Sequence, residues 1–257
     1  MLNIKRIRSA LRYLSWADPI YKWKISQAIC PSCNGKSFIS LKPDPFFTRC
    51  LKCSANITNL SLIPVINKHA DEAKVRDCWE MSTYGATLIY LKANFEHIFE
   101  SEFFSDKEPG SIIDGILNQD VQSLTFQNSS LDLITSNQVF EHVPNDVKGY
   151  QECYRVLRPG GALIFSVPLY SSHQTKKLAE IVEGDLVFHE EPEYHDSRLG
   201  GPKSALTFWR HSKNDICSRV SSAGFNTKLE EVFLTPNQRF PSLVVYAKKS
   251  KQTPPQP

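Results

Sequence analysis

Four of the seven cysteines form two Cys-x-x-Cys pairs, the spacing of metal-binding knuckles. Cys30 is paired with Cys33 and Cys50 with Cys53, and sixteen residues separate the two pairs. Each pair presents two thiolates on one side of a tight turn, so that two turns together complete a tetrahedron of sulfur ligands. Four sulfurs leave no position for water or substrate, and we therefore expect a structural zinc ion in a zinc ribbon. Four unrelated free cysteines are the alternative.

Composition places this motif in a globular chain of moderate size. The 257 residues are 41% hydrophobic and 22% charged, which is typical of a chain with one main domain and a small appendage. No apolar run reaches the roughly 20 residues of a membrane-spanning helix. Paired cysteine motifs without a secretory signal predict a cytoplasmic protein. The net charge of +3 gives only weak support for a nucleic-acid partner.

Beyond the ribbon, apolar runs alternate with helical patterns, which predicts a parallel sheet covered by helices. The predicted strands are 96–101, 131–136 and 161–167, a helix covers 146–156, and strands 227–234 and 242–247 close the sheet as an antiparallel pair. The expected organisation is an amphipathic helical segment at 1–25, a zinc ribbon at 26–66, a main domain at 70–248 and a disordered tail at 249–257. We expect the first segment to dock on the protein itself, with an anionic membrane surface or partner as the alternative.

Two long motifs carry a family resemblance. Residues 129–143 read SSLDLITSNQVFEHV, and residues 154–168 read YRVLRPGGALIFSVP. This pair resembles the core of the Rossmann-like S-adenosylmethionine-dependent methyltransferases of type 11, and the resemblance extends over about 74–248. It implies an α/β fold with a mostly parallel sheet and an antiparallel last strand, preceded here by a small zinc ribbon. It also implies methyltransferase activity and S-adenosyl-L-methionine as cofactor.

The resemblance assigns the cofactor to a crevice at the carboxyl ends of the strands, where ligands of open α/β sheets bind. Glu102, with Glu100 as the alternative, would bind the ribose hydroxyls. Asp120 would accept a hydrogen bond from the adenine amino group, Val121 would cover the ring, and Asn137 would meet the methionyl end. A solvated glutamate and a turn-capping aspartate are the simpler interpretations of the two acidic residues.

The loop after the first strand departs from the family pattern. Glu80 stands at the position of the family's acidic residue, but Gly85 is the only glycine left in the loop. Fewer glycines restrict the approach of the backbone to the cofactor's carboxylate. We expect hydroxyl groups of Ser82, Thr83 and Tyr84 to replace some of these contacts.

Histidines and carboxylates gather between the predicted core strand and the last helix, where the resemblance implies the acceptor cover. An alcohol acceptor benefits from a general base, and His195 is our candidate, oriented by Glu193 or Asp196. His189 is the second choice, and a polar surface loop without any chemical role is the alternative. We expect the pair Glu141-His142 to be structural or to line the rim of the cofactor pocket.

These expectations combine into one function with two competitors. The first is an S-adenosylmethionine-dependent methyltransferase acting on an unidentified acceptor, for which an oxygen of a small molecule or sugar is the first choice. The second is a non-catalytic methyltransferase-like interaction protein that keeps the structural zinc ribbon. The third is a nucleic-acid-modifying enzyme that uses the ribbon to bind its substrate.

Overall fold

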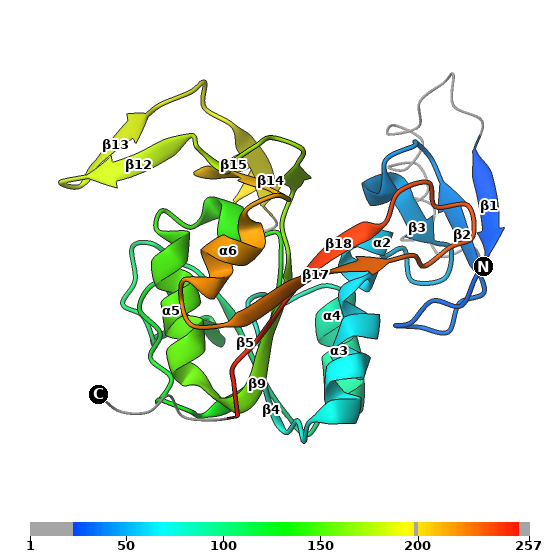
Figure 1. Cartoon of the computed structure of the whole chain (residues 1–257), viewed down its shortest axis with the longest axis horizontal. Helices are drawn as coiled ribbons and strands as arrows, with labels where there is room; N and C mark the ends of the chain where they lie inside the picture. The colour runs from blue at the N-terminus through cyan, green and yellow to red at the C-terminus, as the bar shows by residue number, and fades with distance from the viewer. Residues whose placement is uncertain (1–22, 198–199, 252–257) are drawn as a thin grey trace.

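The computed structural model describes residues 23–197 and 200–251 (Figure 1). Almost all of the amphipathic segment expected at 1–25, and most of the tail expected at 249–257, lie outside the described residues. None of the described helices is long and apolar enough to cross a membrane.

A central eight-stranded sheet organises the main domain in the order β17-β18-β9-β8-β4-β5-β7-β6. Strands β4, β5, β7, β8 and β9 are mutually parallel, whereas β18 is antiparallel to both β9 and β17. The bounds are β4 (Asp77–Glu80), β5 (His97–Glu102), β6 (Ile112–Ile113), β7 (Ile116–Asn118), β8 (Leu131–Asn137), β9 (Leu157–Ser166), β17 (Asn226–Val232) and β18 (Ser242–Lys248). The mostly parallel α/β sheet with an antiparallel last strand is thus confirmed.

Helices cover both faces of this sheet (Figure 1). On one face lie α3 (Leu62–Glu72) and α4 (Ala86–Asn94), and on the other lie α5 (Asp146–Val156) and α6 (Ile216–Ser221). The apolar side of α3 is buried against β8 and β9, so residues before 66 already belong to the core of the main domain. The boundary expected near residue 70 therefore lies inside a helix.

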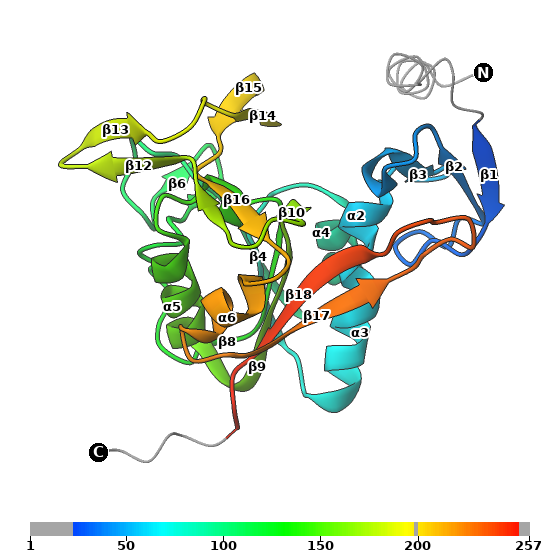
Figure 2. The same cartoon turned by 45° about the horizontal axis from the view of Figure 1, so that its top comes forward.

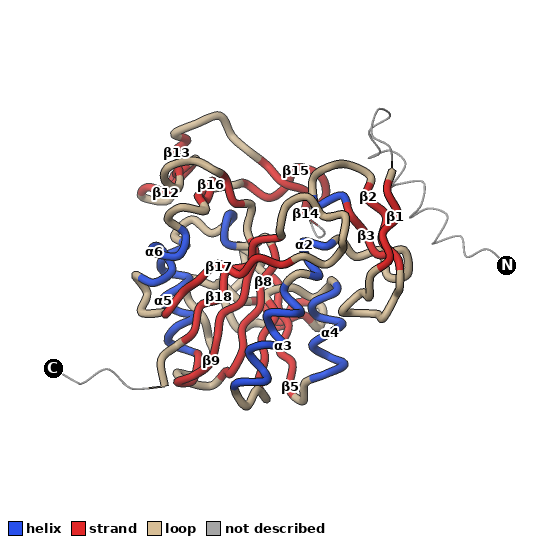
Figure 3. Tube along the Cα trace, turned by 45° about the vertical axis from the view of Figure 1, so that its right-hand side comes forward, coloured by secondary structure: helices blue, strands red, loops and turns tan. Residues whose placement is uncertain are grey.

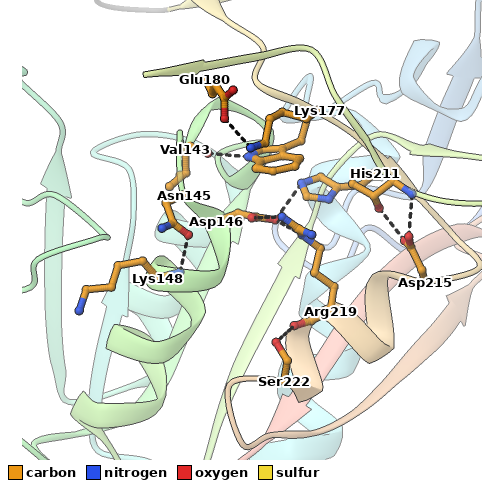
Figure 4. Close-up of polar contacts among 12 residues, drawn as sticks. Val143, Asn145, Asp146, Lys148, Lys177, Glu180, His211, Asp215, Arg219 and Ser222 are labelled. Atoms are coloured by element: carbon orange, nitrogen blue, oxygen red, sulfur yellow. Dashed lines mark hydrogen bonds and ion pairs between the residues drawn. The ribbon is translucent and has the colours of Figure 1, made fainter. Parts of the chain in front are cut away.

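An ion pair joins α5 to α6 on the face of the sheet that these two helices cover. The buried carboxylate of Asp146 accepts hydrogen bonds from Nε and Nη2 of Arg219, both at 2.6 Å (Figure 4). The Asn145 side chain caps α5 by accepting a hydrogen bond from the Lys148 backbone N–H at 3.1 Å. Together these contacts fix the start of α5, which follows shortly after the motif at 129–143 that contains β8.

The ribbon is a small antiparallel sheet, β1 (Lys24–Gln27), β2 (Ser37–Ser40) and β3 (Thr48–Cys50), with the short helices η1 (Pro45–Phe47) and α2 (Ile57–Leu60). Its buried residues form one cluster with Ala86 of α4, and Tyr90 of the same helix packs against that cluster. The Ser32 hydroxyl also donates a hydrogen bond to the Ala86 carbonyl at 3.4 Å. The ribbon is therefore docked at the first turn of α4, next to the carboxyl end of β4.

Seven short strands follow β9 and precede α6. They form a cover over the same edge of the sheet (Figures 2 and 3). They are β10 (Leu169–Tyr170), β11 (Lys176–Lys177), β12 (Ala179–Val182), β13 (Asp185–Phe188), β14 (Tyr194–Ser197), β15 (Gly201–Leu206) and β16 (Trp209–Ser212). The pairs β12-β13 and β14-β15 are separate hairpins. Ribbon and cover thus rise beside one another above the ends of the parallel strands.

Candidate functional site

Two adjoining cavities open at the carboxyl ends of the parallel strands. Met81, Glu102, Val139 and His142 line both of them. The walls of the first are mainly apolar and include Trp79, Phe103, Val121 and Pro144. The second is more polar and lies between the sheet, the ribbon and the cover. This is the position at which open α/β sheets bind ligands, and the two cavities together form one hollow.

Glu102 ends β5 and borders both cavities. Its Oε1 accepts hydrogen bonds from the backbone N–H of Thr83 at 2.9 Å and from the Thr83 hydroxyl at 2.6 Å. The alternative residue, Glu100, lines neither cavity and instead forms an ion pair with Lys92 at 2.5 Å. Of the two glutamates, Glu102 is the one that can contact a ligand in the hollow.

Asp120 and Val121 line the first cavity. The Asp120 Oδ1 accepts hydrogen bonds from the backbone N–H of Gln122 at 2.8 Å and from its side-chain Nε2 at 3.2 Å. Asp120 therefore caps a turn, as the simpler interpretation held, and also borders the cavity. Both of these hydrogen bonds use the same oxygen, Oδ1.

Glu80 ends β4 with a side chain that is buried in the floor of the second cavity. It accepts a hydrogen bond from the hydroxyl of Thr135. Burial raises the pKa of Glu80 to about 8, and the nearby charge of Glu102 adds to the effect, while the Thr135 hydrogen bond opposes it. At neutral pH the burial of Glu80 therefore favours its protonated carboxyl group.

The loop between β4 and α4 uses its hydroxyl groups within the protein. Ser82 donates to the carbonyl of Tyr84 at 3.0 Å, and Thr83 donates to Glu102. A hydroxyl has one proton to donate, so in this arrangement neither group can donate to a cofactor as the sequence suggested. Gly85 adopts a φ of +108° at the start of α4, a conformation that favours glycine, and lines the second cavity with Ser82.

Asn137, at the end of β8, borders the second cavity. Its Nδ2 donates to the Thr87 hydroxyl in the first turn of α4 at 2.9 Å, and its Oδ1 accepts from the Ser166 hydroxyl at 3.3 Å. These contacts hold the amide between the first turn of α4 and the end of β9. Asn137 thus lies at the floor of the hollow, close to Gly85.

His195, on β14 of the cover, also lines the second cavity. Its Nε2 lies 3.2 Å from Oε1 of Glu193. Glu193 is fixed in turn by Arg210, whose Nε and Nη2 donate to Oε2 at 2.8 Å and 2.7 Å. Asp196 lines the same cavity, but His189 pairs with Glu180 beside the β12-β13 hairpin and lines neither cavity. The proposed base and its orienting residue thus meet at the hollow.

Glu141 and His142, in the short helix η2 (Phe140–His142), reach the same region. The His142 Nδ1 donates to the carbonyl of Leu206 at 2.8 Å, and burial lowers the pKa of His142 to about 4, so the ring is neutral at pH 7. Burial raises the pKa of Glu141 to about 8. His142 lines both cavities, which agrees with an expected place at the pocket rim.

Three ribbon-side residues in the second cavity were not anticipated from the sequence. Phe46 of η1, Asn59 of α2 and Asn56, which precedes α2, line this cavity from the ribbon. Nothing in their spacing indicates a site, because they reach the hollow only through the docking of the ribbon on α4. Asn56 also caps α2 by accepting a hydrogen bond from the Asn59 backbone N–H at 2.8 Å.

The four ribbon cysteines bring their sulfurs together. Cys30 Sγ lies 3.7 Å from Cys53 Sγ, and Cys33 Sγ lies 3.6 Å from Cys50 Sγ. Ligands at about 2.3 Å from a tetrahedral zinc ion lie about 3.8 Å apart, so these separations fit the ion. The hydrogen bond between Cys30 and Cys53 lowers the pKa of Cys30 to about 5 and raises that of Cys53.

Each knuckle closes in the same way. The residue after each pair, Asn34 or Ser54, has a positive φ, and its N–H donates to the carbonyl of the first cysteine of that pair. The two turns therefore repeat one geometry, which aims all four sulfurs at a common point.

Residues 53–165 match the family described as "Methyltransferase domain". A ubiquinone biosynthesis O-methyltransferase of Coxiella burnetii is 33% identical over 95 residues, which cover 37% of this chain and 40% of that protein. A malonyl-[acyl-carrier protein] O-methyltransferase of Methylococcus capsulatus is 39% identical over 64 residues, 25% of this chain and 23% of that protein. The chain thus spans less than half the length of these relatives.

A solved structure of an S-adenosylmethionine-dependent methyltransferase from Mesorhizobium loti superimposes with a TM-score of 0.48 at 15% identity. The superposition covers 74% of this chain and 98% of that structure.

Proposed function

We propose, because residues 53–165 match the methyltransferase-domain family, that the chain transfers a methyl group from S-adenosyl-L-methionine to an oxygen of a small molecule or sugar. One observation carries the proposal. Glu102 and Asp120, on separate strand ends, border one cavity, and that cavity continues into a second one bordered by His195. A nucleoside site and an acceptor site are therefore contiguous.

In this proposal the nucleoside occupies the first cavity. Glu102 accepts hydrogen bonds from the ribose hydroxyls, because a carboxylate offers several lone pairs and Thr83 uses only Oε1. Asp120 accepts from the adenine amino group, with Val121 and the exposed ring of Phe103 against the base. The methionyl group extends into the second cavity toward Glu80, Asn137 and the first turn of α4.

Methyl transfer requires the acceptor oxygen, the methyl carbon and the sulfur to lie in line. The oxygen forms the new bond to carbon while the carbon–sulfur bond breaks, and its electron pair remains on sulfur. The hydroxyl proton passes to Nδ1 of His195, because Nε2 faces Glu193, which stabilises the resulting imidazolium. Phe46, Asn56 and Asn59 line the acceptor site from the ribbon.

We further propose that the ribbon binds one structural zinc ion through Cys30, Cys33, Cys50 and Cys53. The support is the tetrahedral fit of the sulfur separations and the repeated knuckle geometry. None of the seven cysteines forms a disulfide, and we propose the reducing cytoplasm as the compartment of this protein.

Calorimetric titration of the zinc-loaded full chain with S-adenosylhomocysteine tests the cofactor site. We expect saturable binding of one equivalent, and no binding at millimolar ligand would refute the transferase. The second test is transfer of a radiolabelled methyl group to a pool of small hydroxylated metabolites. Binding without any transfer would favour the non-catalytic interaction protein instead.

A further inference from the structure

Three side chains with metal-ligating atoms converge beside the second cavity. They are Glu141 and His142 of η2 and His195 of the cover strand β14. Glu141 Oε1 lies 3.8 Å from Nε2 of His142 and 3.9 Å from Nδ1 of His195. The rings of His142 and His195 stand edge to face with centroids 4.9 Å apart. Two segments far apart in the sequence thus contribute to one cluster.

The carboxylate in this cluster lacks the partners that burial demands. Glu141 is 1% exposed, and neither of its oxygens has a hydrogen-bond partner among the described residues. A buried carboxyl group without hydrogen-bond partners destabilises the folded protein. Neither histidine relieves this cost, because both ring nitrogens lie beyond hydrogen-bonding distance. No hydrogen bond between the three groups therefore closes the space that separates them.

Both rings turn an unprotonated nitrogen toward that space. Nδ1 of His142 donates to the Leu206 carbonyl, so the lone pair of the neutral ring is on Nε2, which faces Glu141. Nε2 of His195 is engaged by Glu193, which leaves the Nδ1 lone pair facing Glu141. Metal-ligating histidines are held in this way, by a carbonyl or a carboxylate on the other nitrogen.

We propose that Glu141, His142 and His195 bind a divalent transition-metal ion at the edge of the acceptor cavity. Ligands at about 2.1 Å from a tetrahedral ion lie about 3.4 Å apart, so the two separations from Glu141 need only a small contraction, and all three ligand atoms lie within 4.8 Å of one another. Two imidazoles and one carboxylate suit such an ion and leave coordination positions free. His142 and His195 both line the cavity, so these free positions would be open to an acceptor oxygen or water.

The ion would change the role of His195 in the proposed methyl transfer, and this consequence rests on the proposed function. A divalent ion held by these three residues would lower the pKa of a hydroxyl group in the cavity, so that its proton could pass to solvent water. His195 would then hold the ion through Nδ1 and would not take the proton, while the methyl group would pass from sulfur to the acceptor oxygen as described above.

Cobalt(II) titration of the zinc-loaded full chain tests the site without any assay of activity. Zinc occupies the four thiolates, so added Co²⁺ reports a site of nitrogen and oxygen ligands, free of the intense sulfur-to-cobalt absorption bands. We expect one equivalent to bind. Glu141→Gln and His195→Ala should each weaken this binding at least tenfold. The control, His189→Ala, should bind Co²⁺ as the wild type does, because His189 pairs with Glu180 outside the cavity.

Absence of Co²⁺ binding to the wild type at millimolar concentration, or unchanged affinity in Glu141→Gln, would overturn the site. Glu141→Gln should fold about as stably as the ion-free wild type, because the amide has nearly the shape of the carboxyl group and, like the protonated acid, carries no charge. Titration of the wild type with S-adenosylhomocysteine separates the two proposals. A wild type that binds S-adenosylhomocysteine but no Co²⁺ would refute only the metal site, and one that binds Co²⁺ but no S-adenosylhomocysteine would refute only the transferase.

Discussion

At the scale of single residues, the two acidic strand ends have different environments. Glu80 is buried on β4 with one hydroxyl donor, whereas Glu102 lies at the border of both cavities and accepts two hydrogen bonds from Thr83. In the proposed function, Glu80 responds to the charge of the cofactor and Glu102 binds its hydroxyl groups. Each assignment can be tested by a substitution that removes the charge and keeps the shape.

Glu102→Gln should weaken the affinity for S-adenosylhomocysteine by about 10- to 100-fold, because hydrogen bonds to a charged acceptor contribute about 1.5–3 kcal/mol. Glu100→Gln is the matched control on the same strand, since Glu100 pairs with Lys92 and lines neither cavity. Calorimetric titration measures both variants. Equal affinity of Glu102→Gln and the wild type would exclude a ribose contact at this residue.

Glu80 should make the free energy of unfolding depend on pH. Its pKa is raised to about 8 in the folded protein, above the usual value near 4.5, so the folded state retains a proton that the unfolded state releases. Stability therefore falls as pH rises between these values, by up to about 1.4 kcal/mol per pH unit from this group. Glu80→Gln should remove that part of the slope in urea unfolding between pH 5 and 8. If the free energy of unfolding changed with pH equally in Glu80→Gln and in the wild type, the prediction would be wrong.

At the scale of elements, the sequence predicted what depends on local patterns. Alternating apolar runs located β5, β8 and the pair β17-β18, and the motif at 129–143 located the strand end that carries Asn137. The sequence could not predict that the Thr83 hydroxyl donates to Glu102 rather than to a ligand, or that Arg210 fixes Glu193. Those contacts join separate segments and depend on how loops fold over the sheet, for which no local pattern exists.

The knuckles of the ribbon also depend on one close approach. A methyl group on Gly35 would lie 2.8 Å from Cβ of Lys52, 2.9 Å from Sγ of Cys50 and 3.2 Å from Sγ of Cys33. These distances are shorter than normal contacts, and two of the three atoms are the sulfurs of the cluster. The two turns therefore approach each other too closely at Gly35 to leave room for a side chain there.

Gly35→Ala should displace the sulfurs and speed the loss of zinc, together with a lower melting temperature. The measurement is zinc release to a chromogenic chelator, followed over time. Ser32→Ala serves as control in the same turn, because its hydroxyl contributes only a 3.4 Å hydrogen bond to Ala86 and lies outside the sulfur contacts. Equal rates of zinc release from Gly35→Ala and Ser32→Ala would show that the sulfur cluster does not restrict the space at Gly35.

At the scale of the whole molecule, the ribbon is a wall of the site as well as a folding unit. Its core is continuous with Ala86 and Tyr90 of α4, and Phe46, Asn56 and Asn59 complete the second cavity. The sequence indicated the ribbon and the sheet separately, but their docking surface is made of ordinary apolar residues. A division into a ribbon at 26–66 and a main domain at 70–248 therefore hides the way in which both build one hollow.

Removing zinc from the ribbon should consequently weaken cofactor binding. Without the ion the ribbon is too small to keep its fold, so the wall that it contributes to the second cavity and the support of the first turn of α4 are lost. The main domain keeps its own core on both faces of the sheet and should stay folded.

We expect the affinity for S-adenosylhomocysteine to fall at least tenfold after chelation and to recover when Zn²⁺ is restored. In the zinc-free Glu141→Gln variant, Co²⁺ should restore the affinity for S-adenosylhomocysteine as well as Zn²⁺ does, because four thiolates bind either ion. This variant is used because its proposed site at Glu141 should bind Co²⁺ only weakly. If zinc-free protein with an unfolded ribbon bound the cofactor as tightly as before, the ribbon would be no part of the site, and the hollow would belong to the sheet and its cover alone.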